Sequence, residues 1–321
     1  MNRDVTVHDI ESAAARLGGH IVRTPVRRSE WLSDAAGADV HLKLEVVQPT
    51  SSYKIRGAFN AALQLQARHL PGVRLVTASA GNHGRALAFA ARELGLPLTV
   101  FIASTAPKAK VDAIRAAGAE LQFYADYDEA ERQAKAHAGR GGGVFISPYS
   151  HPDVIAGAGT IGLELLDDVP APEAIVVPVG GGGLIAGIGI AVKSRSPSTR
   201  VIGVEVAASC PFTKSLAAGR LVTIDVGPSL ADGLTGNLDP DTITFDIVRT
   251  VVDRIVVVDE ADLRKAVAGS VTREHLIAEG AAAAGLAAMT AGLDVRGQRV
   301  AVILTGANID AATLVDVLRS T

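Results

Sequence analysis

The sequence is short of cysteine, of aromatic residues and of long apolar runs. Cys210 is the only cysteine among 321 residues, which excludes an intramolecular disulfide and a CxxC metal site and is typical of a reducing compartment. No apolar run reaches the roughly 20 residues that a membrane-spanning helix needs, and the N-terminal segment lacks the apolar core of a secretory signal. We therefore expect a cytoplasmic protein without a membrane partner.

An excess of charge of either sign is also absent. The formal net charge is -3, and basic residues neither form runs nor alternate with aromatic ones, so the electrostatic footprint of a nucleic-acid-binding protein is missing. A small anionic ligand needs only local positive charge and is compatible with this composition. With 48% hydrophobic and 20% charged residues, the chain can bury a large core. Because single cores stop growing at roughly 250 to 300 residues, two lobes are predicted.

Several common catalytic motifs are missing. The sequence contains no GxxxxGK[ST], HExxH or GxSxG, which removes the commonest NTPase, zincin and serine-hydrolase interpretations. The segment GAGTIG, Gly157 to Gly162, matches the dinucleotide pattern GxGxxG, but that fingerprint needs a strand that runs straight into its first glycine. Pro148 and Pro152 separate Gly157 from the preceding predicted strand. These glycines are therefore predicted to permit close helix packing.

Short β-rich runs alternate with alanine-rich segments of helical period. The strands are predicted at residues 40–46, 73–78, 97–103, 120–124, 144–147, 174–179, 200–206, 254–258 and 299–305. The helical segment at 85–95 should end at Gly95, because Pro97 follows. Such alternation predicts an α/β fold with parallel sheets covered by helices on both faces. We expect a small domain at 51–148 and a large domain formed by 1–50 and 149–321.

A run of four glycines follows one predicted strand and precedes an apolar helical segment. A flexible linker would be flanked by polar residues, whereas here a buried strand enters the glycines and an apolar helix leaves them. Glycines lack Cβ atoms, so several backbone N–H groups can point at one anion, and the helix dipole favours its negative charge. A phosphate cradle is therefore predicted at Gly180, Gly181, Gly182 and Gly183.

Two further loops follow predicted strands. In TASAGNHGRALAFAA, unpaired N–H groups at a helix start can hold a carboxylate and an asparagine amide can donate to a phenolate oxygen; the candidates are Ser79, Gly81, Asn82 and His83. Serine and asparagine are also the usual N-cap residues, and a lone histidine is more often structural. No single residue of this loop therefore establishes a binding site. Thr305 places a hydroxyl after the last strand and is equally uninformative alone.

Lys54, in SSYKIRGAF, gives these loops a common chemistry. It stands between an aromatic ring and a small-residue helix start. A lysine that forms a Schiff base with a phosphorylated aromatic aldehyde needs an anion cradle, a donor for the phenolate and a partner for the ring nitrogen. The glycine run, Asn82 and Thr305 are of the types that could supply these. Together the four features predict pyridoxal 5'-phosphate as the cofactor.

The chain as a whole resembles the threonine/serine dehydratase and serine racemase family of fold-type II pyridoxal-phosphate enzymes. The resemblance covers nearly the whole chain, through KLEVVQPTSSYKIRGAFNA, SAGNHGRALAFAARELG, PYSHPDVIAGAGTIGLELL, VVPVGGGGLIAGI, LADGLTGNLDPDTITFDIVR and ILTGANID, in the family's order. It implies two open, mostly parallel twisted sheets covered by helices, as in the tryptophan synthase β fold, with the cofactor between the lobes. It also implies a homo-oligomer, either a dimer or a tetramer.

Matched residue by residue, the resemblance implies that Lys54 carries the cofactor aldehyde and that Tyr53 sits beside the ring. Asn82 would bond the phenolate oxygen, and Thr305 would face the pyridine nitrogen. The backbone groups that would hold the phosphate belong to Gly180, Gly181, Gly182, Gly183 and Leu184. The loop that would take the substrate carboxylate supplies Ser79, Gly81, Asn82 and His83. Glu279 matches an acidic residue near the cofactor.

Three departures from the family pattern bear on the reaction. Serine racemases place a second acid–base serine on the opposite face of the cofactor, where this chain has Ala80, so efficient racemisation is not expected. Glu205 matches the first ligand of a divalent-metal site in some relatives, but Pro211 occupies the later acidic position, and no metal site is predicted. Ala307 replaces a glycine of the family's SGGN and would reshape the pocket floor slightly.

These features predict an ammonia-lyase that converts a β-hydroxy amino acid, by default L-threonine or L-serine, to a 2-oxo acid and ammonia by α,β-elimination. Lys54, displaced by the substrate amine, would remove the α-proton as general base. Two enzymatic alternatives stay open: a dehydratase for hydroxyaspartate, phenylserine or a hydroxyectoine-derived compound, and a serine racemase. Outside enzymes, an amino-acid-binding protein is the alternative, although binding alone needs no Schiff-base lysine.

Overall fold

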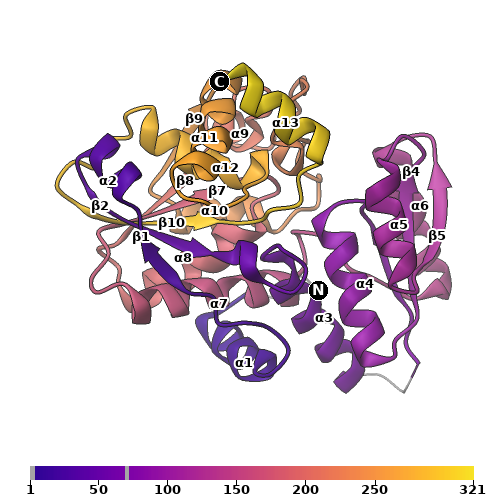
Figure 1. The fold of residues 1–321 in the computed structure, drawn as a ribbon. Coiled ribbons are helices and arrows are strands. Elements are labelled where there is room, and N and C mark those ends of the chain that lie inside the picture. The colour runs from indigo at the N-terminus through magenta and orange to yellow at the C-terminus, as the bar shows by residue number, and fades with distance from the viewer. Residues whose placement is uncertain (1–3, 69–71) are drawn as a thin grey trace.

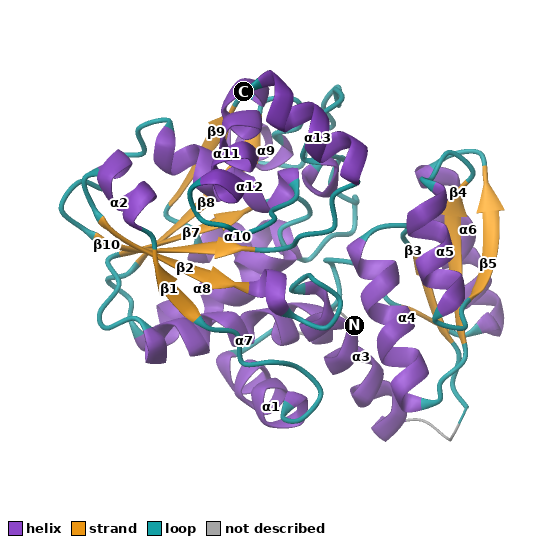
Figure 2. Ribbon diagram, in the orientation of Figure 1, coloured by secondary structure: helices purple, strands orange, loops and turns teal. Residues whose placement is uncertain are grey.

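The computed structural model describes residues 4–68 and 72–321. Its strands form two sheets, one of six strands and one of four (Figure 2). Every segment predicted as a strand contains one, so the predicted α/β architecture is confirmed. One strand, β1 (Val26–Arg28), lies outside the predicted segments; this antiparallel edge strand has three residues and is too short for a period-2 pattern to stand out.

The six-stranded sheet has the order β1-β2-β10-β7-β8-β9 and is parallel except at β1. Its other strands are β2 (Asp39–Leu44), β7 (Ala174–Pro178), β8 (Arg200–Val206), β9 (Arg254–Val258) and β10 (Arg299–Leu304). Alternate residues serve opposite faces: Val176 and Val302 belong to one hydrophobic core, and Ile175 and Ile303 to another. A sheet buried on both faces needs the continuous apolar strands that the sequence shows.

Helices cover both faces of this sheet. The core that contains Val176 also takes residues from α2 (Glu30–Ala36), α11 (Glu260–Thr272), α12 (Gly280–Thr290) and α13 (Ala311–Ser320). The core that contains Ile175 takes residues from α7 (Pro152–Asp168), α8 (Gly183–Arg195), α9 (Pro211–Ala218) and α10 (Thr244–Val251). The helix α1 (Val7–Leu17) packs on α7. We call this sheet and these helices the large lobe.

The four-stranded sheet is parallel throughout and has the order β5-β4-β3-β6. Its strands are β3 (Leu75–Ala78), β4 (Leu98–Ala103), β5 (Glu120–Tyr124) and β6 (Val144–Phe145). The helix α6 (Tyr127–His137) packs on one face, and α3 (Lys54–Arg68), α4 (Asn82–Leu94) and α5 (Lys108–Ala116) share the core of the other. As predicted, α4 ends at Gly95, which has a left-handed φ of 65°.

We call this sheet with α4, α5 and α6 the small lobe. Figure 1 shows that it is one continuous stretch of chain, whereas the large lobe combines segments from both ends of the sequence. The domain boundaries after residues 50 and 148 stay a prediction. Short helical turns lie at η1 (Glu45–Val47), η2 (Ala138–Gly142) and η3 (Asp232–Leu234). Within the described ranges, no helix has the length and apolarity to cross a bilayer.

The GAGTIG segment lies inside α7, where its glycines face neighbouring helices. A Cβ atom on Gly157 would lie 2.5 Å from the carbonyl oxygen of Arg56 in α3, and one on Gly159 would lie 2.8 Å from that of Gly187 in α8. Backbones can approach this closely only where no side chain intervenes. The prediction that these glycines serve helix packing is therefore confirmed.

Candidate active site

Lys54 is the first residue of α3 and lies in space beside the carboxyl end of β10. The preceding chain turns sharply at Ser51, which has a left-handed φ of 54°, and Ser52 forms an isolated antiparallel bridge with Gly306. The Tyr53 N–H then donates to the carbonyl oxygen of Thr305 over 2.9 Å. These contacts hold the lysine beside the loop that carries Thr305, although the two lie about 250 residues apart in the sequence.

The Lys54 amine contacts the segment that covers the glycine loop. Its Nζ donates to the carbonyl oxygen of Pro148 over 2.8 Å and lies 5.2 Å from the centroid of the Tyr53 ring. The next residue, Tyr149, packs on the glycine loop so closely that a Cβ on Gly181 would lie 2.3 Å from its Cγ. Residues 148–149 therefore link the amine to the predicted phosphate cradle.

The glycine run joins β7 to α8, as the sequence predicts. Gly182 is the N-cap of α8 with a left-handed φ of 84°, and a Cβ there would lie 2.5 Å from the Phe212 ring. A Cβ on Gly183 would lie 2.6 Å from the carbonyl oxygen of Tyr149. The first-turn N–H groups, including that of Leu184, have no partner within their own helix and suit an anion. Larger residues here would disturb the packing as well as any anion site.

The loop from β3 to α4 contains the predicted carboxylate-binding residues. The Gly81 N–H donates to Ser79 Oγ over 3.2 Å. Gly84 allows the loop to fold tightly over the helix start, because a Cβ there would lie 2.0 Å from the carbonyl oxygen of Ser79. The N-terminus of α4 therefore presents backbone N–H groups beside the Ser79 hydroxyl, an arrangement that can hold a carboxylate.

The His83 side chain belongs to the interior and not to the open part of this loop. It is buried, and its Nε2 lies 3.3 Å from the carbonyl oxygen of Ile146. Burial, together with the nearby charge of Lys54, lowers the pKa of His83 to about 3. The ring is therefore neutral near pH 7, and the group of His83 that suits a substrate carboxylate is its backbone N–H at the start of α4.

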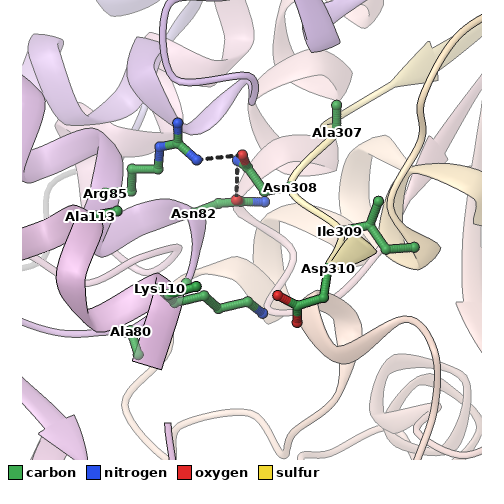
Figure 3. A pocket seen from close by; sticks show the side chains of 11 residues that line it. Ala80, Asn82, Arg85, Lys110, Ala113, Ala307, Asn308, Ile309 and Asp310 are labelled. Atoms are coloured by element: carbon green, nitrogen blue, oxygen red, sulfur yellow. Dashed lines mark hydrogen bonds between the residues drawn. The ribbon is translucent and has the colours of Figure 1, made fainter. Parts of the chain in front are cut away.

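Asn82 lies at the contact between the lobes. Its Nδ2 donates to Glu279 Oε1 over 2.6 Å, and its Oδ1 accepts from Asn308 Nδ2 over 2.7 Å. Arg85 Nη1 donates to Asn308 Oδ1 over 2.6 Å (Figure 3). Neither Arg85 nor Asn308 was predicted as a site residue. The only sequence feature that points to Asn308 is its place three residues after Thr305 in the TGAN loop.

A cavity of about 230 Å³ opens between α4, α5 and the loop after β10 (Figure 3). Of the predicted site residues, only Gly81 and Asn82 line it; Lys54 and the glycine loop do not. Its charged side chains are Arg85, Lys110 and Asp310, and Lys110 Nζ pairs with Asp232 over 2.7 Å. The cavity therefore opens beside Asn82, between the small lobe and the loop after β10.

Glu279 is a buried carboxyl group, with 7% of the residue exposed. Burial raises its pKa to about 7, against the opposing effect of the hydrogen bond from Asn82. The folded protein thus binds this proton more tightly than the unfolded chain, in which a glutamate has a pKa near 4.3. The resulting contribution to stability is full below about pH 4 and is lost as the pH rises through 7.

We therefore expect Glu279→Gln to stabilise the cofactor-free protein relative to wild type at pH 8, by about 3–4 kcal/mol. The advantage should shrink towards zero at pH 4.5, because both proteins are then neutral at this position. Urea unfolding of the two proteins at both pH values measures the difference. An equal difference at pH 4.5 and pH 8 would contradict the raised pKa.

Glu205, the residue that matches a metal ligand in some relatives, has other partners. Its Oε1 accepts from the Phe212 N–H and its Oε2 from the Thr213 N–H, each over 2.8 Å. Burial raises its pKa, while these hydrogen bonds lower it in part. Pro211 is the first residue of α9, a position where its missing N–H costs nothing. Glu205 therefore caps this helix.

The site fits pyridoxal phosphate in the chemistry of its groups. Lys54 offers a primary amine, Asn82 an amide donor and Thr305 a hydroxyl, and the glycine loop offers helix-start N–H groups for an anion. Backbone contacts and packing bring these groups to the carboxyl ends of β3, β7 and β10, the edge where open α/β sheets bind ligands.

Several known proteins are similar to this chain in sequence and fold. The family described as "Pyridoxal-phosphate dependent enzyme" matches residues 17–306. L-threonine ammonia-lyase of Thermotoga maritima is 40% identical over 95% of this chain and 76% of its own length, and L-threo-3-hydroxyaspartate ammonia-lyase of a Pseudomonas species is 38% identical over 97% and 98%. The structure of maize serine racemase superposes with a TM-score of 0.91 at 31% identity, covering 99% of this chain and 98% of that one. The chain therefore belongs to the threonine/serine dehydratase and serine racemase family of pyridoxal-phosphate-dependent enzymes.

Proposed function

We propose that this protein is an ammonia-lyase that converts β-hydroxy amino acids, by default L-threonine or L-serine, to 2-oxo acids and ammonia. The observation that carries the proposal is the position of Lys54, whose amine contacts the Pro148 carbonyl beside the glycine loop. When bound, pyridoxal phosphate supplies an electron sink that acidifies the substrate's α-proton. Lys54 Nζ would hold the cofactor aldehyde and, once the substrate amine replaces it, would take the α-proton.

The remaining site residues would hold the cofactor and orient the substrate. The glycine loop with the Leu184 N–H would hold the phosphate, and Tyr53 would lie beside the ring. Asn82 would donate to the phenolate oxygen. Unlike a carboxylate, the neutral hydroxyl of Thr305 would not stabilise a protonated ring nitrogen, so the nitrogen would stay neutral, which favours elimination over transamination. Ser79 and the α4 N-terminus would hold the substrate carboxylate.

Borohydride labelling tests the position of Lys54. Because a Schiff base is reducible, we expect borohydride to fix the cofactor onto the peptide that contains Lys54 and to remove the yellow absorbance of the purified protein. Mass spectrometry of the digested protein identifies the labelled residue. Labelling at another lysine, with Lys54 unmodified, would refute the assignment.

The side chain of Ala80, which lines the cavity next to Gly81, favours elimination over racemisation. Racemisation needs an acid–base group on each face of the planar intermediate, and a methyl group cannot carry a proton. We expect wild-type protein to form D-serine at a small fraction of the rate of pyruvate, and Ala80→Ser to raise D-serine formation about tenfold or more. Chiral chromatography of residual serine alongside a pyruvate assay measures both rates. D-serine formed by wild type as fast as pyruvate would move the chain to the racemases.

L-threo-3-hydroxyaspartate is a second candidate substrate. The ammonia-lyase named for it is 38% identical to this chain over almost the full length of both proteins. A second substrate carboxylate needs a cationic partner, and Arg85 and Lys110 line the cavity beside Asn82. A comparison of kcat/KM for L-threonine, L-serine and L-threo-3-hydroxyaspartate decides between these candidates.

Cytoplasmic location and homo-oligomeric assembly stay predictions. The first rests on the single cysteine, which is typical of a reducing compartment. The second rests on the resemblance alone. Sedimentation of the purified protein measures the oligomeric state.

A further inference from the structure

We propose that Arg85, Asn308 and Glu279 are positioning residues that hold the Asn82 amide in one orientation, with its nitrogen directed for donation to the cofactor phenolate. The proposal rests on the proposed function, because that function gives Asn82 a phenolate oxygen to bond. It adds three residues that act on the cofactor through Asn82. It also makes the orientation of Asn82 depend on contact between the lobes, since Asn82 and Arg85 lie on α4 and the other two residues lie in the large lobe.

The two ends of the Asn82 amide have partners of opposite character. Glu279 Oε1 lies 2.6 Å from Nδ2, and Asn308 Nδ2 lies 2.7 Å from Oδ1. Turning the amide over would set its nitrogen against the Asn308 N–H donor and would take the N–H donor away from Glu279 Oε1, the atom that now accepts from it. Both hydrogen bonds would be lost, so only one orientation satisfies the site. Nδ2 carries two hydrogens, and we assign the one not shared with Glu279 to the phenolate.

Asn308 is fixed in the same way by Arg85. A guanidinium group can only donate, so the 2.6 Å contact from Arg85 Nη1 identifies its partner atom on Asn308 as the oxygen. Asn308 Nδ2 also donates to the carbonyl oxygen of Thr50 over 3.0 Å, which confirms the nitrogen end. The chain of hydrogen bonds therefore starts at a group that can only donate and ends at a carboxyl oxygen that accepts. Its polarity fixes every amide between them.

The backbone around Glu279 is shaped for this contact. The Glu279 N–H donates to the carbonyl oxygen of Gly306 over 3.1 Å. A Cβ on Gly306 would lie 2.4 Å from Glu279 Oε1 and 3.4 Å from Asn82 Nδ2, so a glycine is required for the carboxyl group to reach the amide. Gly306 also bridges to Ser52, two residues before Lys54. The same loop thus supports both the predicted aldehyde anchor and the amide.

The test uses the purified holoenzyme and its bound cofactor. Glu279→Ala and Asn308→Ala each remove one partner of Asn82, whereas Glu279→Gln keeps an oxygen that can accept from Nδ2. We expect the two alanine variants to shift the visible absorbance maximum of the bound cofactor and to raise its Kd about tenfold, as the loss of one oriented hydrogen bond predicts. We expect Glu279→Gln to stay within threefold of wild type and to keep the wild-type absorbance maximum.

Glu274→Gln is the matched control. Glu274 is also a buried carboxyl, but it pairs with Arg27 through Oε2 over 2.6 Å and accepts from the Ser29 hydroxyl through Oε1, and neither partner is a predicted cofactor residue. The Glu274→Gln variant should have a lower Tm than wild type but the same absorbance maximum of the bound cofactor. The inference is overturned if Glu279→Ala keeps the wild-type maximum and a Kd within twofold, or if Glu274→Gln moves the maximum equally. Wild-type protein that takes up no pyridoxal phosphate would instead overturn the proposed function, and the inference with it.

Discussion

A Lys54→Ala protein is expected to form 2-oxo acid from L-threonine and L-serine at least about 10³-fold more slowly than wild type. The substitution removes both the aldehyde anchor and the base for the α-proton, and general-base catalysis alone contributes about 10²–10⁴-fold. Because Lys54 is half-buried and its amine donates to the neutral Pro148 carbonyl, its loss leaves no opposite charge unpaired, and the fold should persist. A coupled 2-oxo acid assay with circular dichroism of the same samples measures both effects.

Lys108→Ala is the control for this experiment. Lys108 begins α5, has 89% of its side chain exposed and pairs with Asp112 on the same helix. An exposed ion pair of this kind contributes little, so activity should stay within twofold of wild type. Lys54→Ala protein that retained a tenth or more of wild-type activity would show that another group carries the chemistry.

Arg56→Ala is expected to cost about 3–5 kcal/mol of unfolding free energy, as the removal of one partner from a buried ion pair does. Arg56 lies two residues after Lys54, is fully buried, and contacts Glu45 through Nη2 over 2.7 Å and Glu164 through Nη1 over 2.7 Å. Glu45 is fully buried as well. Burial alone would raise the pKa of Glu45, but attraction and hydrogen bonds from Arg56 more than offset it, so the pKa is lowered.

Removing Arg56 therefore leaves the Glu45 carboxylate inside the protein without its main counter-charge. Arg249→Ala is the control, because Arg249 and Asp246 form an ion pair on the surface of α10, with 57% and 77% of their side chains exposed. Its cost should stay below about 0.5 kcal/mol. Urea unfolding at pH 8 measures both variants, and a loss below 1 kcal/mol for Arg56→Ala would contradict the role assigned to this pair.

Much of the fold could be read from local pattern. The apolar strands β7, β8 and β10 of the large sheet stand out because they are buried on both faces. Gly95 marks the end of α4, and the GAGTIG glycines lie within α7 and pack on neighbouring helices, as the sequence predicts. The glycine loop could be predicted because it joins an apolar strand to an apolar helix, and Lys54 because it precedes a helix of small residues. The family resemblance placed the two in one predicted site.

Other features depend on tertiary contacts that no local pattern contains. Tyr149 looks like a loop residue in the sequence, yet its ring packs on Gly181 and its hydroxyl accepts from the Asp239 N–H over 3.1 Å. His83 stands in a polar loop motif but is buried against Ile146. The hydrogen bonds of Arg85 with Asn308, of Asn308 with Asn82 and of Asn82 with Glu279 join residues 223, 226 and 197 positions apart. Only the folded chain brings these segments together.

The release of ammonia from hydroxy amino acids tests the central claim most directly. Purified protein loaded with pyridoxal phosphate is incubated with L-threonine, L-serine and L-threo-3-hydroxyaspartate, and ammonia and 2-oxo acid are measured together. We expect the two products in equal amounts, with L-threonine or L-serine as the best substrate. Cofactor bound at Lys54 with no ammonia released from any of the three amino acids would contradict the proposed reaction.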